Sequence, residues 1–144
     1  MFYNTVQLGV TLKSVPVRSS VDFEAAFLAM VRDRVAALSI TTSPLFGTEG
    51  KRLAALAMKH QLPTVGGSRE MAEAGILVAY GTDYPNLFRQ AATFVDKILK
   101  GPKPGDLPIQ QPTKFEMIVN MKTAKTLGIK FPGEIMLQAT KVIE

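Results

Sequence analysis

Residues 76–86 read ILVAYGTDYPN, and this stretch decides the fold. It predicts a short apolar strand over Ile76–Tyr80, then a small polar loop, and directly afterwards an amphipathic helix. In an open α/β sheet, ligands bind where strand ends meet helix beginnings, because backbone N–H groups and the positive end of the helix dipole are exposed there. Residues 80–83 are expected at such a point, so the stretch indicates recognition chemistry.

The helix that follows, expected over Asp83–Lys100, has the clearest signals in the chain. Asp83 suits its first turn, Lys97 suits its last turn, and Gly101 with the next proline stops it. A continuous apolar stripe runs along it, formed by Tyr84, Leu87, Phe88, Ala91, Ala92, Val95, Ile98 and Leu99. Residues 101–114 then form a Pro-rich connector, which we expect to run extended over the surface.

Strands and helices alternate along the rest of the chain. Strands are predicted over Val10–Val17, Val35–Thr41, Pro63–Val65 and Phe115–Asn120. Helices are predicted after a Ser20 cap and over Phe46–His60, Arg69–Ala74, Lys122–Leu127 and Glu134–Ile143. The alternation predicts an α/β fold in which residues 1–144 form a single domain, a three-layer sandwich with a mostly parallel central sheet.

Composition narrows the possible functions. The chain has 144 residues, 47% hydrophobic and 20% charged, which is typical of one globular domain. It has no cysteine and a single histidine, His60, so thiolate metal sites and two-imidazole sites are excluded. The net charge of +5 comes from scattered basic residues, which favours a solvated surface over a nucleic-acid interface. We therefore expect no metal, no cofactor and no nucleic-acid partner.

Two observations bear on localisation. No apolar run approaches the roughly 18 residues that a membrane-spanning helix needs. The first residues, MFYNTVQLGVTLK, lack the basic and apolar regions of a signal peptide. As written, the chain is expected to stay in the cytoplasm.

Candidate binding residues follow three predicted strand ends, which a parallel sheet would gather at one edge. They are Thr42, Ser43 and Pro44, then Ser68, Arg69 and Glu70, then Tyr80 and Asp83. Arg69 could pair with a ligand carboxylate as a planar fork, Glu70 or Asp83 could accept from an ammonium group, and Tyr80 could stack or donate. The alternative is that these residues only cap helices and shape turns, Asp83 above all. No nucleophile, base and orienting acid can be assembled, so we expect no enzyme.

The sequence resembles the ABC-transporter substrate-binding proteins, including binders of aromatic amino acids. The resemblance rests on four stretches in order: VRSSVDFEAAF, LAALAMKHQLPTV, REMAEAGILVAYGTDYPNLFRQAATFVDKILKG and DLPIQQPTKFEMIVNMKTAKTLGIKFP. It implies a type I clamshell, in which two α/β lobes close on a ligand and dock on a membrane permease. Only the second half of such a clamshell matches, and the family is periplasmic or lipid-anchored outside the cytoplasm.

Two functional hypotheses follow from this resemblance. The first is a solute-binding component, or a truncated remnant of one, that holds a small amino-acid-like ligand at the strand-end edge. The second is a structural or interaction protein that keeps the fold, dimerises and binds nothing. In either case the apolar stripe of the helix over Asp83–Lys100, which packs on the first lobe in such clamshells, needs another cover. We therefore expect a twofold homodimer.

Overall fold

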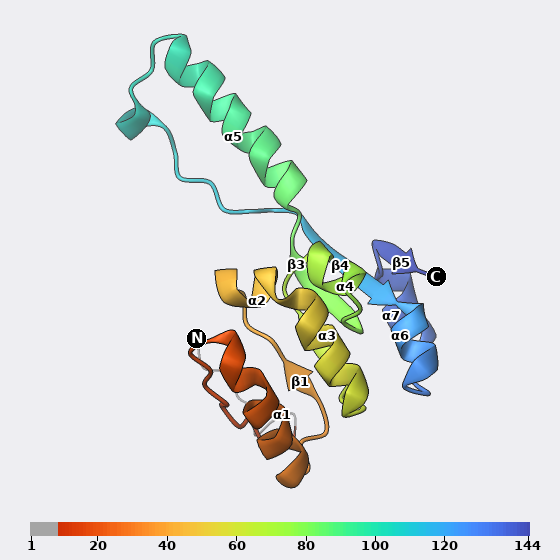
Figure 1. The fold of residues 1–144 in the computed structure, drawn as a ribbon. Coiled ribbons are helices and arrows are strands. Elements are labelled where there is room, and N and C mark those ends of the chain that lie inside the picture. Colours follow the sequence, from red (N-terminus) through yellow and green to blue (C-terminus); the bar gives the residue numbers. More distant parts are fainter. Residues whose placement is uncertain (1–8) are drawn as a thin grey trace.

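The fold is built on a five-stranded sheet, seen in a computed structural model that describes residues 9–144 (Figure 1). The strands lie side by side in chain order. Their bounds are β1 Leu38–Ser39, β2 Thr64–Gly66, β3 Val78–Thr82, β4 Phe115–Asn120 and β5 Lys141–Ile143. Three of the four pairings are parallel, and β3 with β4 is antiparallel. The predicted mostly parallel α/β sheet is confirmed.

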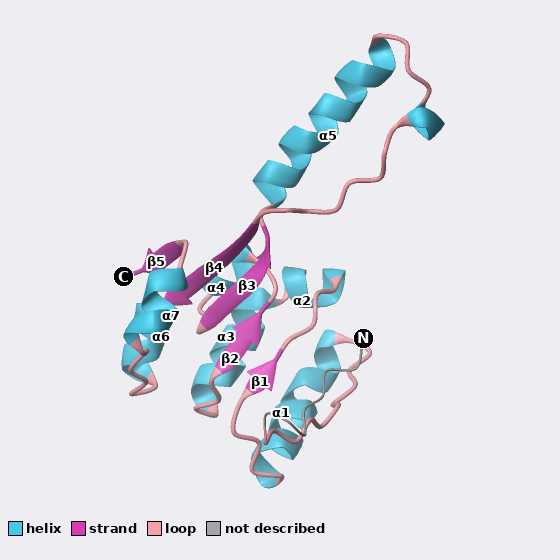
Figure 2. Cartoon of the chain, turned by 180° about the vertical axis from the view of Figure 1, so that it is seen from behind, coloured by secondary structure: helices cyan, strands magenta, loops and turns pink. Residues whose placement is uncertain are grey.

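The helices of the described part alternate with these strands. Their bounds are α1 Phe23–Arg32, α2 Pro44–Thr48, α3 Gly50–Lys59, α4 Arg69–Glu73, α5 Tyr84–Leu99, α6 Met121–Thr126 and α7 Gly133–Gln138. Two single 3-10 turns, η1 Ser20–Asp22 and η2 Pro104–Asp106, complete them. The helix α3 lies behind the sheet in Figure 2, whereas α6 and α7 lie at its β4–β5 end.

The main core lies between the sheet and the helices α1 and α3. Phe23 and Phe27 of α1 are almost fully buried, and they pack in one cluster with Leu53 and Leu56 of α3. The guanidinium of Arg52 lies over the Phe23 ring, 5.7 Å from its centroid. This cluster fixes one face of the sheet and holds the ends of β1 and β2 in place.

The opposite face of the sheet is covered only in part. Strand alternation and register place Val65, Val78, Tyr80 and Phe115 on this face. Val65 is 41% exposed, Tyr80 55% and Phe115 51%. Among the described residues, no helix lies across β1, β2 and β3 on this side (Figure 2). We call these four residues the open sheet face.

The helix α5 projects away from the rest of the fold (Figure 1). It starts where β3 ends, and the chain returns from it to β4 through residues 101–114, which are mostly extended and include η2. No residue of this helix is buried. Phe88 is 72% exposed and Leu99 81%. The predicted helix is confirmed, and its apolar stripe has no cover within the described chain.

Three predictions for individual elements were wrong. The predicted strand over Val10–Val17 is absent, because these residues pair with no strand among those described. They border instead a hollow of about 980 Å³ that α1 and the residues around β1 also line. The helix predicted over Phe46–His60 is two helices, interrupted at Glu49. The helix predicted over Glu134–Ile143 ends at Gln138, after which β5 forms.

The start of α1 also differs from the prediction in its cap. Ser19, not Ser20, takes the N-cap position, at the turn η1 that leads into the helix. The Asp22 carboxylate accepts backbone N–H hydrogen bonds from Arg18 and Ser19, each 2.9 Å long. These bonds hold the entry to α1 in place.

Candidate functional site

The loops that follow β1 and β2 and the end of β3 are in direct contact. A Cβ atom placed on Gly81 would lie 2.0 Å from the carbonyl oxygen of Gly67, and one on Gly67 would lie 2.4 Å from Thr42 Oγ1. Only glycine lets the backbones approach this closely. The predicted gathering of the three strand ends at one edge is confirmed.

The first loop is shaped by the start of α2. Ser43 is its N-cap, and the Ser43 hydroxyl accepts a hydrogen bond of 3.3 Å from the backbone N–H of Phe46. Pro44 occupies the first helical turn, where its missing N–H is not needed. Thr42 is exposed, with its hydroxyl beside Gly67. In this loop, therefore, Ser43 and Pro44 have capping roles and Thr42 is open to a ligand.

Ser68 has the strongest geometric claim to a binding role. It takes the N-cap position of α4 with extended backbone angles, φ −145° and ψ 157°, yet its side chain makes no capping hydrogen bond. Its carbonyl oxygen accepts from the backbone N–H of Met71 at 3.2 Å. Because its hydroxyl forms no hydrogen bond with any described residue and is half-buried at the loop junction, it can donate to a ligand or accept from one.

Arg69 already holds a carboxylate, which belongs to Glu116 on β4. Its Nε lies 3.2 Å from Glu116 Oε1, and Nη2 makes a second bond to Oε2. The side chain of Glu116 is nearly buried and that of Arg69 is 38% exposed. Hydrogen bonding and charge from Glu116 raise the pKa of Arg69, with smaller contributions from Asp83 and Glu73. A ligand carboxylate would therefore compete with Glu116 for this fork.

The two acidic candidates differ in position. Asp83 caps α5, since its carboxylate accepts from the backbone N–H of Asn86 at 3.0 Å. Its own N–H donates to the carbonyl of Lys114 at 3.1 Å, which ties the base of α5 to the returning chain. Glu70 is exposed in the first turn of α4. The structure thus gives Asp83 the capping role of the alternative interpretation and leaves Glu70 open to solvent.

Tyr80 is separated from the rest of this set by the pleat of the sheet. It pairs with Met117, whereas Gly81 pairs with Glu116, so the Tyr80 ring and the Arg69–Glu116 pair lie on opposite faces. The ring stacks on Phe115, with centroids 6.0 Å apart and planes at 12°. Arg69 and Tyr80 therefore do not converge on one pocket wall.

Two further polar residues of β4 organise this region and were not predicted from sequence. Glu116 holds Arg69, and the buried Asn120 donates from Nδ2 to the carbonyl of Ala72 at 2.9 Å. Asn120 Oδ1 also accepts from the backbone N–H of Thr123. The sequence feature that could have indicated the role of Glu116 is a charged residue at position 116 within the mostly apolar run FEMIVN.

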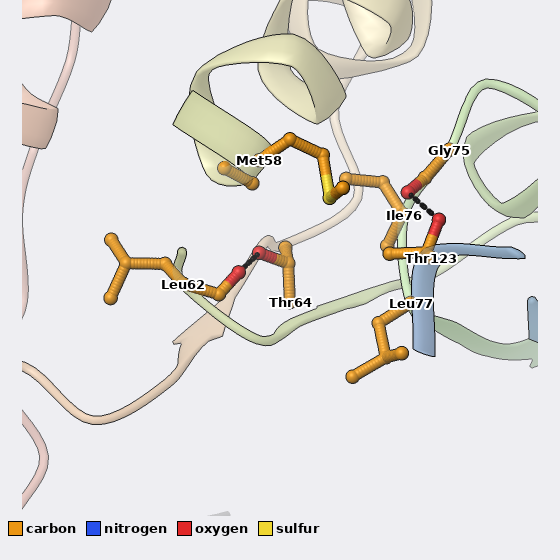
Figure 3. Close-up of a pocket in the computed structure, with 8 residues that line it drawn as sticks. Met58, Leu62, Thr64, Gly75, Ile76, Leu77 and Thr123 are labelled. Atoms are coloured by element: carbon orange, nitrogen blue, oxygen red, sulfur yellow. Dashed lines mark hydrogen bonds between the residues drawn. The ribbon is translucent and has the colours of Figure 1, made fainter. Parts of the chain in front are cut away.

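A small space near the start of β2, shown in Figure 3, is closed to ligands. It lies among Leu62, Thr64, Ile76 and Thr123, and it is too narrow for a water molecule. Its two hydroxyls bond to backbone carbonyls, from Thr64 to Leu62 at 2.9 Å and from Thr123 to Gly75 at 2.8 Å. This space is part of the core.

No group of metal-ligating side chains occurs within residues 9–144. None of the helices described there is both long and apolar enough to cross a membrane.

A family model described as "ABC transporter substrate binding protein" matches residues 3–143. The chain belongs to this family. A curated relative, the tyrosine-binding protein of Clostridioides difficile (strain R20291), is 23% identical over 128 residues, which are 89% of this chain and 35% of the relative.

Solved structures share the fold. The ABC domain from Streptococcus pneumonia in complex with L-Trp has a TM-score of 0.85 at 22% identity, and a conserved domain protein from Vibrio cholerae has 0.84 at 23%. A ligand-free, open substrate-binding protein with adhesive properties from Clostridium difficile has 0.71 at 20%. Each comparison covers 96% of this chain and 46% of the other. The chain therefore spans less than half the length of the relatives that it matches.

Proposed function

We propose that this chain forms one lobe of a solute-binding component of an ABC transport system. Its ligand is a small molecule with the chemistry of an amino acid, which contacts the loops after β1 and β2. The observation that carries the proposal is the direct contact of the loops after β1 and β2 with the end of β3, in a chain that matches the family over residues 3–143. The named ligands of two relatives, tyrosine and L-Trp, support the amino-acid class.

The chemistry of the loops agrees with such a ligand. The hydroxyls of Thr42 and Ser68 offer donors and acceptors at the loop junction, and Glu70 is exposed nearby to meet an ammonium group. The Arg69 fork is occupied by Glu116, so it contributes through its remaining N–H groups or by exchange with the ligand. Tyr80 lies on the other face of the sheet, and we give it no role in this contact.

A thermal-shift screen of amino acids tests the proposal. Because one lobe contacts a ligand from one side, affinity should be weak, and a ligand at 100 times its dissociation constant adds about 2.7 kcal/mol. We expect L-Trp or L-Tyr to raise the melting temperature, and Ser68→Ala to reduce that shift. Thr126→Ala, at an exposed position of helix α6, is the matched control and should keep it. If no amino acid shifts the melting temperature, the proposal fails.

That negative result would favour the second candidate, a non-binding protein that keeps the fold and dimerises. The observation that favours this candidate is the uncovered stripe of α5. The two candidates share an expectation of self-association and differ only in ligand binding, so the screen separates them.

The partners and setting of the whole protein belong to the same proposal. A permease is expected from the family, and catalysis is not, because the family binds and delivers solutes. The expectation that the chain as written stays in the cytoplasm conflicts with the extracytoplasmic setting of the family. Cell fractionation of the expressed chain, followed by immunodetection, decides between the two compartments.

A further inference from the structure

The ion pair between Arg69 and Glu116 lies next to the contact of the strand-end loops. Glu116 pairs in register with Gly81, and the backbone of Gly81 is the one that touches Gly67. Arg69 follows in the same loop two residues after Gly67, as the first residue of α4. The state of this pair therefore decides which charges a ligand meets at the proposed edge.

The pair occupies one side of the guanidinium completely. Nε of Arg69 donates to Glu116 Oε1 at 3.2 Å, and Nη2 donates to Oε2. This is the two-bond geometry in which arginine holds a carboxylate most strongly. The remaining N–H groups of the 38% exposed Arg69 side chain can still donate, but their positive charge is already balanced by Glu116.

Exchange of Glu116 for a ligand carboxylate is unfavourable. Glu116 is almost buried, so its displacement would leave an uncompensated charge inside the fold, which is strongly destabilising. A ligand held by one lobe binds weakly and cannot compensate for this loss. We therefore expect Arg69 to stay with Glu116 when a ligand is bound.

Other acidic groups near Arg69 act in the same direction. Hydrogen bonding and charge from Glu116 raise the pKa of Arg69, and the charges of Asp83 and Glu73 add to this effect more weakly. A ligand carboxylate would add a further negative charge to this group. An ammonium group instead meets the exposed Glu70, which forms no ion pair with any residue in the range 9–144.

We propose that Glu116 determines which charged group of the ligand this lobe recognises. By holding Arg69, it leaves the ammonium group of the ligand, which pairs with Glu70, as the recognised charge. This inference rests on the proposed function and narrows its ligand class to primary amines, with the carboxylate dispensable for contact with this lobe.

A ¹⁵N NMR titration with three probes that share one phenol ring tests the inference. L-Tyr has both charged groups, tyramine lacks the carboxylate, and 3-(4-hydroxyphenyl)propionate lacks the amine. We expect tyramine to bind about as tightly as L-Tyr. The propionate should bind about tenfold more weakly or less, as for the loss of a hydrogen bond to a charged group. The matching indole series is L-Trp, tryptamine and indole-3-propionate.

The outcomes separate this inference from the proposed function. If the amino acid of a series binds and its amine binds at least tenfold more weakly, the inference fails and the proposed function stands. If the propionate binds as tightly as the amino acid, the inference fails in the same way. If no probe of either series binds, both fail.

Variants of the chain give a second measurement. Glu116→Gln keeps the shape of the side chain and frees the charge of Arg69, so it should bind L-Tyr and the propionate several times more tightly and leave tyramine unchanged. Glu70→Gln should weaken L-Tyr and tyramine alike. Glu134→Gln is the matched control, because Glu134 is exposed in the first turn of α7 as Glu70 is in that of α4.

An equal effect of Glu116→Gln on L-Tyr and tyramine overturns the role of Glu116 in specificity. An effect of Glu70→Gln no larger than that of Glu134→Gln overturns the role of Glu70. If Glu116→Gln does not fold by circular dichroism, the titrations of the parent chain still decide, because they need no substitution.

Discussion

Arg69 and Glu116 connect the start of α4 to the middle of the sheet. Glu116 is 8% exposed and lies in a strand whose other residues, except Asn120, are apolar, so an isolated carboxylate there would be strongly unfavourable. The guanidinium satisfies both of its oxygens. The pair therefore fixes where α4 begins, and with it the position of Ser68 in the loop after β2.

Replacing Glu116 by Gln should test this role. The change keeps the shape of the side chain and removes the charge that Arg69 needs, so we expect a loss of about 1–3 kcal/mol in the free energy of unfolding. Glu73→Gln is the matched control, because its ion pair with Lys141 is exposed on both sides, so that this change should lower the free energy of unfolding less than Glu116→Gln does. Urea denaturation measures both variants, and equal effects would contradict the account.

The carboxyl group of Asp22 makes the free energy of unfolding depend on pH in the acid range. Backbone hydrogen bonds from Arg18 and Ser19 lower its pKa below the ordinary value of 3.8. Because the pKa of Asp22 is lower in the folded state than in the unfolded state, its carboxylate stabilises the fold at pH values above the unfolded-state pKa. This contribution is lost as the pH falls through the folded-state pKa.

We therefore expect Asp22→Asn to lower stability at pH 7 and to reduce the decline in stability below pH 4. The measurement is urea denaturation at pH values from 7 to 3. Asp106→Asn, in the exposed turn η2, is the control and should leave the decline unchanged. A parent-like acid profile in Asp22→Asn would show that these hydrogen bonds do not stabilise the entry to α1.

At the scale of elements, the contact of Gly81 with Gly67 decides how closely the ends of β2 and β3 approach each other at the proposed ligand edge. Gly81→Ala would place a Cβ 2.0 Å from a backbone oxygen, so the loops must separate. We expect a loss of about 1–3 kcal/mol in stability, as for other overpacked sites. Gly105→Ala meets open space and should be nearly neutral. If Gly81→Ala is as stable as Gly105→Ala by thermal denaturation, the loops are not in contact.

Elements with strong local signals could be predicted from the sequence. The stripe and end signals of α5 gave its position to within a residue or two, and the apolar run of β4 gave Phe115–Asn120. The strand β5 could not be predicted, because its three residues are ordered by pairing with β4 and have a weak local pattern. Residues 10–17 show the opposite case, since their alternation suits a strand that finds no partner here.

The candidate site was predictable in outline only. The position of the three loops followed from topology, and the Asp83 cap followed from its place before a helix. The pairing of Arg69 with Glu116 joins residues 47 positions apart, which no local pattern reveals. The separation of Tyr80 from Arg69 depends on the register of β3 against β4, which the sequence does not specify.

At the scale of the whole molecule, the proposed ligand edge belongs to a single lobe. The chain spans 46% of the solved relatives and 35% of the curated one. A ligand held from one side loses the enclosure that most small-molecule sites have, so its affinity should be weak.

The most direct test of the central claim is a ¹⁵N NMR titration of the chain with L-Trp and L-Tyr, which detects dissociation constants of about 1 mM, or about −4 kcal/mol. The account predicts amide shifts confined to residues 41–44 and 66–70 and to Gly81, which contacts Gly67, with β5 and α7 unchanged. Ser68→Ala should weaken the response. Shifts that map to the hollow beside residues 9–17, or no shifts at saturating ligand, would contradict the claim that the strand-end loops bind the solute.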